Sequence, residues 1–403
     1  MLKGYNIKYI VLALYCLITF GSYFTFVYSN LTNILLVVLI FFLPQFKYTF
    51  NNKRLFLAIG LLLLYMHMSF TFSEGFQPLK YAVIVPLLPF FAKSDILETY
   101  KIFVKLFLIS TIPSGIILLL HVFGIQSIVP SYTIFEGRPF IVFPGTVLQP
   151  MEFTNIAGIT FYRISGIMGE PGGLGAISIL ILMAEKMNLN KRSNQYILAI
   201  GLISFSLAFY VLLILYFLLE ILFDKSQVSK YKLVVIFVFL GLILMNSSFY
   251  EYYIGKRVSD IDIENPSARN TRTSVTALDF FRKFLNQDLN AIMIGHGYGG
   301  NIDISAIEGA QGINYMAYFY NFGLLNVFSL FFLIFLILYK KEYRSYSIIA
   351  LLIIISSFYQ RPYIFNNGYL FLFFALSYRS EEVSREKQSL GKVRQVISPL
   401  IIK

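Results

Sequence analysis

Apolar runs near 20 residues recur along the whole chain, and this repetition is the feature that most limits its fold. A helix needs about 20 mostly apolar residues to cross a bilayer. Of the 403 residues, 57% are hydrophobic and 13% are charged, whereas soluble domains carry roughly 25% charged residues. The sequence therefore predicts an all-α polytopic membrane protein, in which residues 1–403 form a single integral membrane domain.

Comparison of the apolar runs with the charged segments predicts about 12 transmembrane helices. The expected spans are 9–28, 31–46, 55–72, 79–92, 102–125, 167–184, 195–206, 208–223, 232–249, 315–339, 346–359 and 363–378. The run 195–223 is too long for one helix and is divided near "SFSLAF"; one long tilted helix is the alternative. The first run lacks a small-residue cleavage site, which predicts a retained span rather than a signal peptide.

The distribution of positive charge predicts the orientation of these spans. With the N-terminus in the cytoplasm, the short basic loops and the tail 379–403 all lie on the cytoplasmic side, as the positive-inside rule requires. The formal net charge of +12 then follows from topology and attraction to anionic membrane lipid, and it requires no nucleic-acid partner. The tail itself is expected to be a short amphipathic helix on the inner surface or a disordered segment.

Two large extracytoplasmic loops follow from this topology, 126–166 and 250–313. The second contains "SVTALDFFRKFLNQ", in which Leu278, Phe281 and Leu285 share one helical face, and this pattern predicts an amphipathic helix. The apolar segment "IMIGHGYGG" follows and is expected to be a strand or a turn. Its glycines do not match a nucleotide-binding loop.

Arginine is enriched on the predicted outer side. Ten of the 33 Lys and Arg residues lie outside, and seven of these ten are arginines. Topology requires positive charge but not guanidinium, whose planar set of donors binds phosphate or carboxylate in a bidentate way. The second loop is not net basic, because its acids offset its six cations. The candidates for discrete anion contacts are Arg163, Arg269, Arg272 and Arg282, and pairing with the loop's own acids is the alternative.

The stretch "YRISGIMGEPGGLG", residues 162–175, places polar residues at the start of an apolar run. Pro171 is expected at the first helical position, where its missing N–H costs nothing. Glu170 can cap the helix and oppose its positive end, and the glycines permit close approach of another helix or a ligand. The two compatible interpretations are a small-residue packing face and a helix N-terminus that faces an anionic or sugar substrate beside Arg163.

Cysteine and histidine usage predicts no metal site and no cofactor. Cys16 is the single cysteine, so an internal disulfide is excluded and no cluster of Cys and His exists. His67 and His121 lie in predicted spans, where each is expected to pack against a polar neighbour. His296 lies between glycines and is either a general base or only a turn residue.

The order of these motifs resembles a known family. "RISGIMGEPGGLG", then "ARNTR", an amphipathic helix, "IGHGYGG" and "INYMAYFYNFGLLN" resemble the O-antigen polymerases of the Wzy type and the related O-antigen ligases. The resemblance covers most of the chain, although the family's motifs are loose. It implies a GT-C-like glycosyltransferase of the bacterial cytoplasmic (inner) membrane, with both termini cytoplasmic and the active site on the periplasmic face.

The activity that the resemblance implies is glycosyl transfer from undecaprenyl diphosphate-linked oligosaccharide. A polymerase moves the growing glycan to the non-reducing end of a lipid-linked repeat unit, by metal-independent inverting transfer, and a chain-length regulator in the same membrane is an expected partner. A ligase moves the glycan to lipid A core. Ligases have a histidine beside an asparagine before the tenth span, where this chain has Ile313 before Asn314, and this departure counts against a ligase.

By motif position, the resemblance implies that the diphosphate is held by Arg163 and by one of Arg269 or Arg272. Because the leaving group is already good, such arginines need only to stabilise its growing charge.

The acceptor hydroxyl needs positioning and a base. Glu170 is the first candidate for the catalytic base and His296 is the second, while Asn314 and Tyr315 are candidates for positioning the sugar. A flippase or another transporter of lipid-linked oligosaccharide is the alternative from a different class. It predicts polar residues along the spans at mid-membrane, and the sequence contains few.

Overall fold

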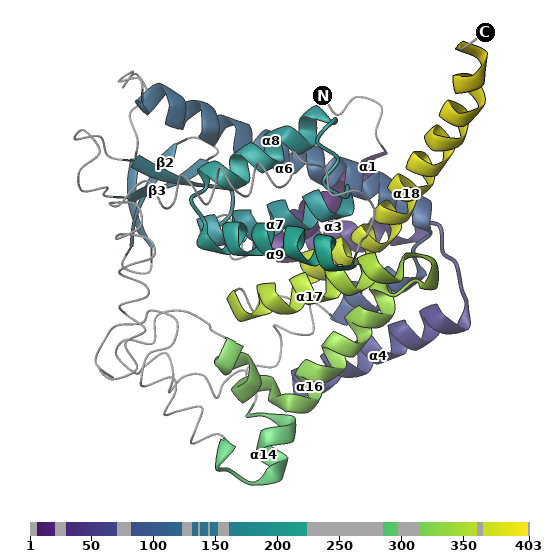
Figure 1. Cartoon of the computed structure of the whole chain (residues 1–403). Coiled ribbons are helices and arrows are strands. Elements are labelled where there is room, and N and C mark those ends of the chain that lie inside the picture. The colour runs from purple at the N-terminus through teal and green to yellow at the C-terminus, as the bar shows by residue number, and fades with distance from the viewer. Residues whose placement is uncertain are drawn as a thin grey trace.

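The computed structural model describes residues 6–20, 30–70, 82–122, 131–135, 138–143, 146–151, 161–223, 285–296, 315–360 and 366–401. Within these residues the chain is mostly helical, which confirms the predicted helical class. Figure 1 shows the helices packed against one another, with a small sheet at one side of the molecule.

The N-terminal part consists of helices and two 3-10 turns. Its elements are α1 (Ile7–Thr19), α3 (Leu31–Phe42), η1 (Leu43–Gln45), α4 (Asn52–Phe70), η2 (Val85–Phe90) and α6 (Lys93–Val122). Helix α1 begins where the side chain of Asn6 accepts a hydrogen bond from the Lys8 N–H at 3.1 Å, as an N-cap residue does. It packs against α3 and α6.

An antiparallel four-stranded sheet occupies the predicted first loop, in the order β1-β2-β3-β4. Its strands are β1 (Ser131–Phe135), β2 (Arg138–Phe143), β3 (Thr146–Met151) and β4 (Phe161–Gly166). This sheet is an addition to the all-α prediction. Strand β4 contacts α6 and leads directly into α7, so the sheet positions the start of that helix.

Helix α7 (Pro171–Ala184) lies at the centre of the packing. All of its residues except Gly173 are buried, as expected for a helix that is apolar around its whole circumference. It contacts α8 (Arg192–Ile203), α9 (Leu207–Phe223) and α18 (Asn367–Ile401). The remaining elements are α14 (Leu289–Ile294), α16 (Tyr315–Leu338), η5 (Lys341–Tyr343) and α17 (Arg344–Gln360).

Two details of the predicted spans are tested by these helices. The run 195–223 divides as expected, because α8 ends at Ile203, α9 begins at Leu207, and Phe205 between them is left-handed with φ 48°. In the described part of the predicted span 79–92, residues 82–84 are α-helical and the six-residue 3-10 helix η2 follows them in place of a continuous α-helix. Pro86 and Pro89 cause the difference, since proline removes a backbone donor and clashes with the preceding turn.

Length and composition give weak support for membrane crossing. Among the described residues, one segment, Lys93–Leu120, is both long enough and apolar enough to span a bilayer. The helices Phe322–Leu338 and Lys341–Phe358 meet this criterion only together, and they are bent by 92°. The other apolar helices are shorter, and the predicted span 232–249 lies outside the described residues. The 12-span topology therefore stays a prediction.

The predicted tail 379–403 is helical through Ile401, because α18 continues without a break from Asn367 to Ile401. Figure 1 shows its C-terminal part projecting away from the other helices, in yellow.

Candidate functional site

The turn between β4 and α7 depends on Gly166, which has φ +58°. A Cβ atom at this position would lie 2.9 Å from Cγ2 of Thr111 on α6. The Met168 N–H donates to the Ser165 carbonyl at 3.0 Å and closes the turn. Glycine is therefore needed here for both its conformation and its size.

Helix α7 begins as the sequence predicts, with Glu170 at the N-cap position and Pro171 directly after it. The Glu170 carbonyl accepts from the N–H groups of Gly173 and Leu174 at 3.1 and 3.3 Å. The Glu170 side chain makes no capping hydrogen bond, so the carboxylate is not used as the cap of this helix.

Gly175 confirms the small-residue packing face. A Cβ atom at Gly175 would lie 2.8 Å from the Phe209 Cβ and 3.0 Å from the Ser206 Oγ. The first turns of α7 and α9 therefore approach closely at this position. Gly173 has more space, with the Met168 Cβ as the nearest atom at 3.8 Å.

Arg163 joins strand β4 to the break between α8 and α9. Its side chain is half-buried, and its Nη2 donates to the Phe205 carbonyl at 3.0 Å. This carbonyl lies just beyond the C-terminal end of α8, where a helix favours a cation. Strand β4, the start of α7 and the α8–α9 break thus form one group of packed elements, which carries both Arg163 and Glu170.

His296 lies in a different group of elements. Its backbone N–H donates to the Tyr320 carbonyl at 2.9 Å, and its imidazole ring stacks on the Tyr320 ring with centroids 4.4 Å apart. Its Nε2 lies 2.5 Å from Oε1 of Gln287. Figure 1 shows α14, which precedes His296, beside α16 and well away from β2 and β3. The structure therefore does not bring His296 to Arg163.

The expected strand or turn at "IMIGHGYGG" is corrected in its first part, because Met293 and Ile294 end the short helix α14. Asp288 is its N-cap residue, and its carbonyl accepts from the Ile292 N–H at 3.2 Å. Gly295, with φ 85°, ends the helix. Gly323, with φ +69°, allows the backbone of α16 to contact that of Met293.

The other candidates are described only in part. Tyr315 is the first residue of α16. Arg269, Arg272, Arg282 and Asn314, and most of the predicted amphipathic helix, lie outside the described residues. In the part of the chain that is described, no group of three or more His, Cys, Asp or Glu residues is placed to hold a metal ion.

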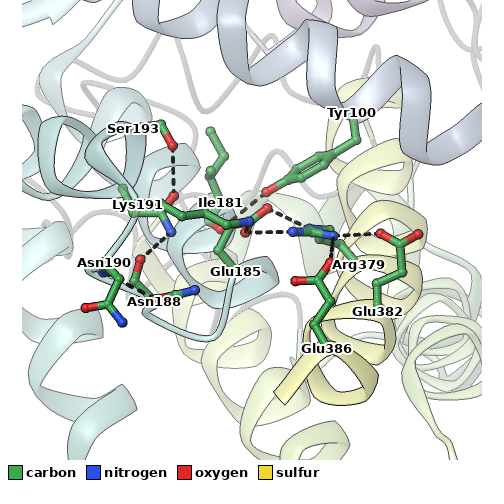
Figure 2. Close-up of polar contacts among 11 residues, drawn as sticks. Tyr100, Ile181, Glu185, Asn188, Asn190, Lys191, Ser193, Arg379, Glu382 and Glu386 are labelled. Carbon is green, nitrogen blue, oxygen red and sulfur yellow. Dashed lines mark hydrogen bonds and ion pairs between the residues drawn. The ribbon is translucent and has the colours of Figure 1, made fainter. Parts of the chain in front are cut away.

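A second polar network lies at the opposite end of α7 (Figure 2). Glu185 follows the last turn of α7, and its Oε1 lies 2.8 Å from Nε of Arg379 on α18. Lys191 Nζ lies 2.7 Å from the other oxygen of Glu185. Arg379 also pairs with Glu382 at 2.7 Å and with Glu386 at 3.1 Å. These charges come from three separate segments that meet at the end of α7.

The charges in this network compensate one another. Burial raises the pKa of Glu185, but the hydrogen bonds from Arg379 and Lys191 outweigh it, and the pKa lies below its usual value. Burial likewise lowers the pKa of Arg379, and its carboxylate partners raise it by more. We interpret the network as a structural joint between α7 and α18.

The histidine in α4 has the polar neighbour that the sequence predicts. Asn326 Nδ2 lies 2.9 Å from His67 Nδ1, and it also donates to the Phe322 carbonyl at 2.7 Å. Buried Asn326 thus links α4 to α16, which supports a packing role for His67. The side chain of His121 lies outside the described residues.

Comparisons of the chain with known protein families, with curated proteins and with solved structures found no match. The resemblance to O-antigen polymerases therefore stays a hypothesis that depends on the quoted motifs.

Proposed function

We propose that this protein is a polysaccharide polymerase of the bacterial cytoplasmic membrane. It transfers a growing glycan from undecaprenyl diphosphate to the non-reducing end of a lipid-linked repeat unit. The observation that carries the proposal is the placement of Arg163, which is held at the α8–α9 break beside the buried start of α7.

Arg163 supplies the group that the leaving diphosphate needs. A guanidinium has five N–H donors and keeps its charge at every physiological pH. The contact with the Phe205 carbonyl at 3.0 Å fixes the orientation of this guanidinium before substrate binds. Charge grows on the diphosphate as its bond to the sugar breaks, and donors that are already oriented stabilise that charge without reorganisation.

The N-terminal end of α7 adds to this effect. A helix N-terminus carries a partial positive charge, and its first N–H groups bind anions. Strand β4, which contains Arg163, packs against α7, and Gly166 turns the chain directly from one element into the other. An anion at this position would be stabilised by the guanidinium and by the helix together.

Glu170 is the proposed base for the attacking group. The acceptor hydroxyl oxygen attacks the anomeric carbon of the donor sugar, while its proton passes to the Glu170 carboxylate. The bond between the anomeric carbon and the diphosphate oxygen breaks, and its electron pair leaves with the diphosphate. Because the attack comes from the face opposite the leaving group, the anomeric configuration inverts.

The proposal is tested with purified full-length protein in proteoliposomes and undecaprenyl diphosphate-linked repeat units. We expect a ladder of lengthened lipid-linked glycan, and little product from the same sugar on a lipid monophosphate. Repeat units that cross the bilayer without lengthening would support the flippase. Transfer only to added lipid A core would support the ligase, and either result would contradict polymerisation.

A further inference from the structure

Several cations converge on one carboxylate, Glu381 of α18. Lys93 Nζ lies 3.0 Å from Glu381 Oε1, and Arg385 Nη2 lies 2.6 Å from the same oxygen. Lys340 pairs with the other oxygen and donates to the Ser377 carbonyl at 3.1 Å. Glu381 is 14% exposed, so this carboxylate is largely enclosed by its partners.

Helix α4 adds two further cations at the same place. Arg54 Nη2 donates to the Tyr378 hydroxyl at 3.3 Å, and Lys340 Nζ lies 5.2 Å from the centre of the same ring. Arg54 Nη1 also donates to the Phe91 carbonyl at 3.0 Å, beside the start of α6. The basic cluster consists of Lys53, Arg54, Lys93, Lys340 and Arg385, and the charge of Lys53 acts on Lys340.

The basic cluster carries an excess of positive charge. Burial lowers the pKa of Lys340, and the charges of Lys93 and Lys53 lower it further, although Glu381 acts in the opposite direction. A bound anion would reduce this repulsion.

Two of the other nearby acids, Glu98 and Asp95, have partners of their own. Glu98 pairs with Lys101 at 2.6 Å, and Asp95 accepts from the Tyr9 hydroxyl at 2.8 Å and from the Lys47 N–H at 2.6 Å. The exposed Glu342 lies one residue beyond Lys341 in the turn that follows Lys340.

Helix stability does not explain why Lys53 and Arg54 lie at the start of α4 or why Lys93 lies at the start of α6, although Asp95 is in the first turn of α6. Lys53 and Arg54 are in the first turn of α4, and this turn contains no acid. Lys93 is the first residue of α6. Cations are unfavourable at helix N-termini because the helix end is itself positive, whereas an anion placed between these two helix ends would be stabilised by both.

The surface beside the cluster indicates what kind of anion fits. Phe56, Ile59 and Leu63 are 54%, 47% and 64% exposed and share one face of α4. Lys53, three residues before Phe56, lies on that same face at its cationic end. An apolar stripe that ends in a group of cations matches an amphiphile with an anionic headgroup, since free phosphate would gain nothing from the stripe.

We propose that the basic cluster and the apolar stripe Phe56, Ile59 and Leu63 bind an anionic phospholipid. The phosphate group lies among the cations and an acyl chain lies along α4. The site is separate from the proposed active site, because Glu381 follows Arg379 at the C-terminal end of α7 and Arg163 lies near the N-terminal end. The inference therefore does not depend on polymerase activity.

The test measures lipid binding to the purified full-length protein in detergent by native mass spectrometry. Phosphatidylglycerol and phosphatidylcholine are the two lipid probes. Lys53→Gln with Lys93→Gln should weaken phosphatidylglycerol binding about 30-fold, because each lysine near an anionic headgroup contributes about fivefold. Lys101→Gln with Lys105→Gln removes the same charge from exposed positions of α6 and should leave binding unchanged.

Two further measurements separate the sources of the phosphate group. Phe56→Ser should weaken phosphatidylglycerol binding and leave all cations in place, so it tests the lipid assignment even if the lysine variant does not fold. Inorganic phosphate at equal concentration should not displace the lipid. Equal affinity for phosphatidylcholine, an unchanged lysine variant, or displacement by inorganic phosphate would overturn the proposal.

Discussion

Arg379 of α18 contacts Glu185 at the C-terminal end of α7, with Nε and Oε1 2.8 Å apart and each side chain 10% exposed. This contact joins residues 194 positions apart in the chain. It holds one end of the central helix, and the other end carries Glu170 and follows strand β4, which contains Arg163 and packs against this helix. The ion pair therefore stabilises the helix on which the proposed site depends.

Replacing Arg379 by Leu should destabilise the protein strongly. The Glu185 carboxylate would stay buried with Lys191 as its remaining cationic partner, so the loss should approach the lower end of the about 3–5 kcal/mol that breaking a buried pair costs. Lys101→Leu is the control, because the Lys101–Glu98 pair is exposed and such pairs contribute about 0–1 kcal/mol. Because the chain has no Trp, unfolding is followed by circular dichroism at 222 nm. Equal losses in the two variants would contradict the structural role of Arg379.

Stability should also fall on acidification. Burial raises the pKa values of Glu185 and Glu381, but hydrogen bonds from their cationic partners outweigh this effect. Both pKa values therefore lie below the usual 4.5. A carboxyl group with a lower pKa in the folded state contributes stability above its unfolded pKa and loses it as the pH falls through its folded pKa. The free energy of unfolding should therefore decrease below about pH 4.5, and Glu185→Gln should make this decrease shallower. An identical acid profile for the variant would count against the predicted shift.

Gly175→Ala should separate α7 from α9. The added Cβ would lie 2.8 Å from the Phe209 Cβ, and overpacking of this kind costs about 1–3 kcal/mol. Gly115→Ala is the matched control in α6, where nothing lies within 4 Å of the new atom; the helix should gain about 0.5–1 kcal/mol. Thermal unfolding of both variants checks the prediction, which is wrong if Gly175→Ala is the more stable variant.

Glu170→Gln should abolish the reaction and preserve the fold. The loss of a general base lowers a rate by about 10²–10⁴-fold, while Gln keeps the size of Glu and one acceptor oxygen, so we expect little change in melting temperature. Glu98→Gln, which removes an exposed carboxylate, is the control. Initial rates of chain lengthening in proteoliposomes measure the effect, and a near-normal rate would remove Glu170 from the mechanism.

Local sequence signals predicted the helical class of the fold and two of its helix boundaries. Pro171 after Glu170 indicated where α7 begins, and "SFSLAF" indicated the break at Phe205. Apolar periodicity and proline affect the conformation of neighbouring residues, so helices and their ends can be recognised without knowledge of distant contacts.

Features that depend on distant contacts were not predicted. The four-stranded sheet has short strands, and its pairing is decided by contacts among them. The partner of Glu185 could not be identified from the sequence, because Arg379 lies on a different helix. The contact of Arg163 with the Phe205 carbonyl could not be identified from the sequence for the same reason. The enrichment of arginine indicated Arg163 only as a candidate for anion binding.

The most direct test of the proposed function is the length of surface glycan in cells whose only copy of this protein carries Arg163→Lys. The variant keeps the positive charge but loses the planar set of donors, and Arg192→Lys at the start of α8 is the matched control. At equal protein level in the membrane, we expect Arg163→Lys to leave single repeat units and the control to give the full ladder on a gel. A full ladder from Arg163→Lys would show that this guanidinium does not hold the diphosphate.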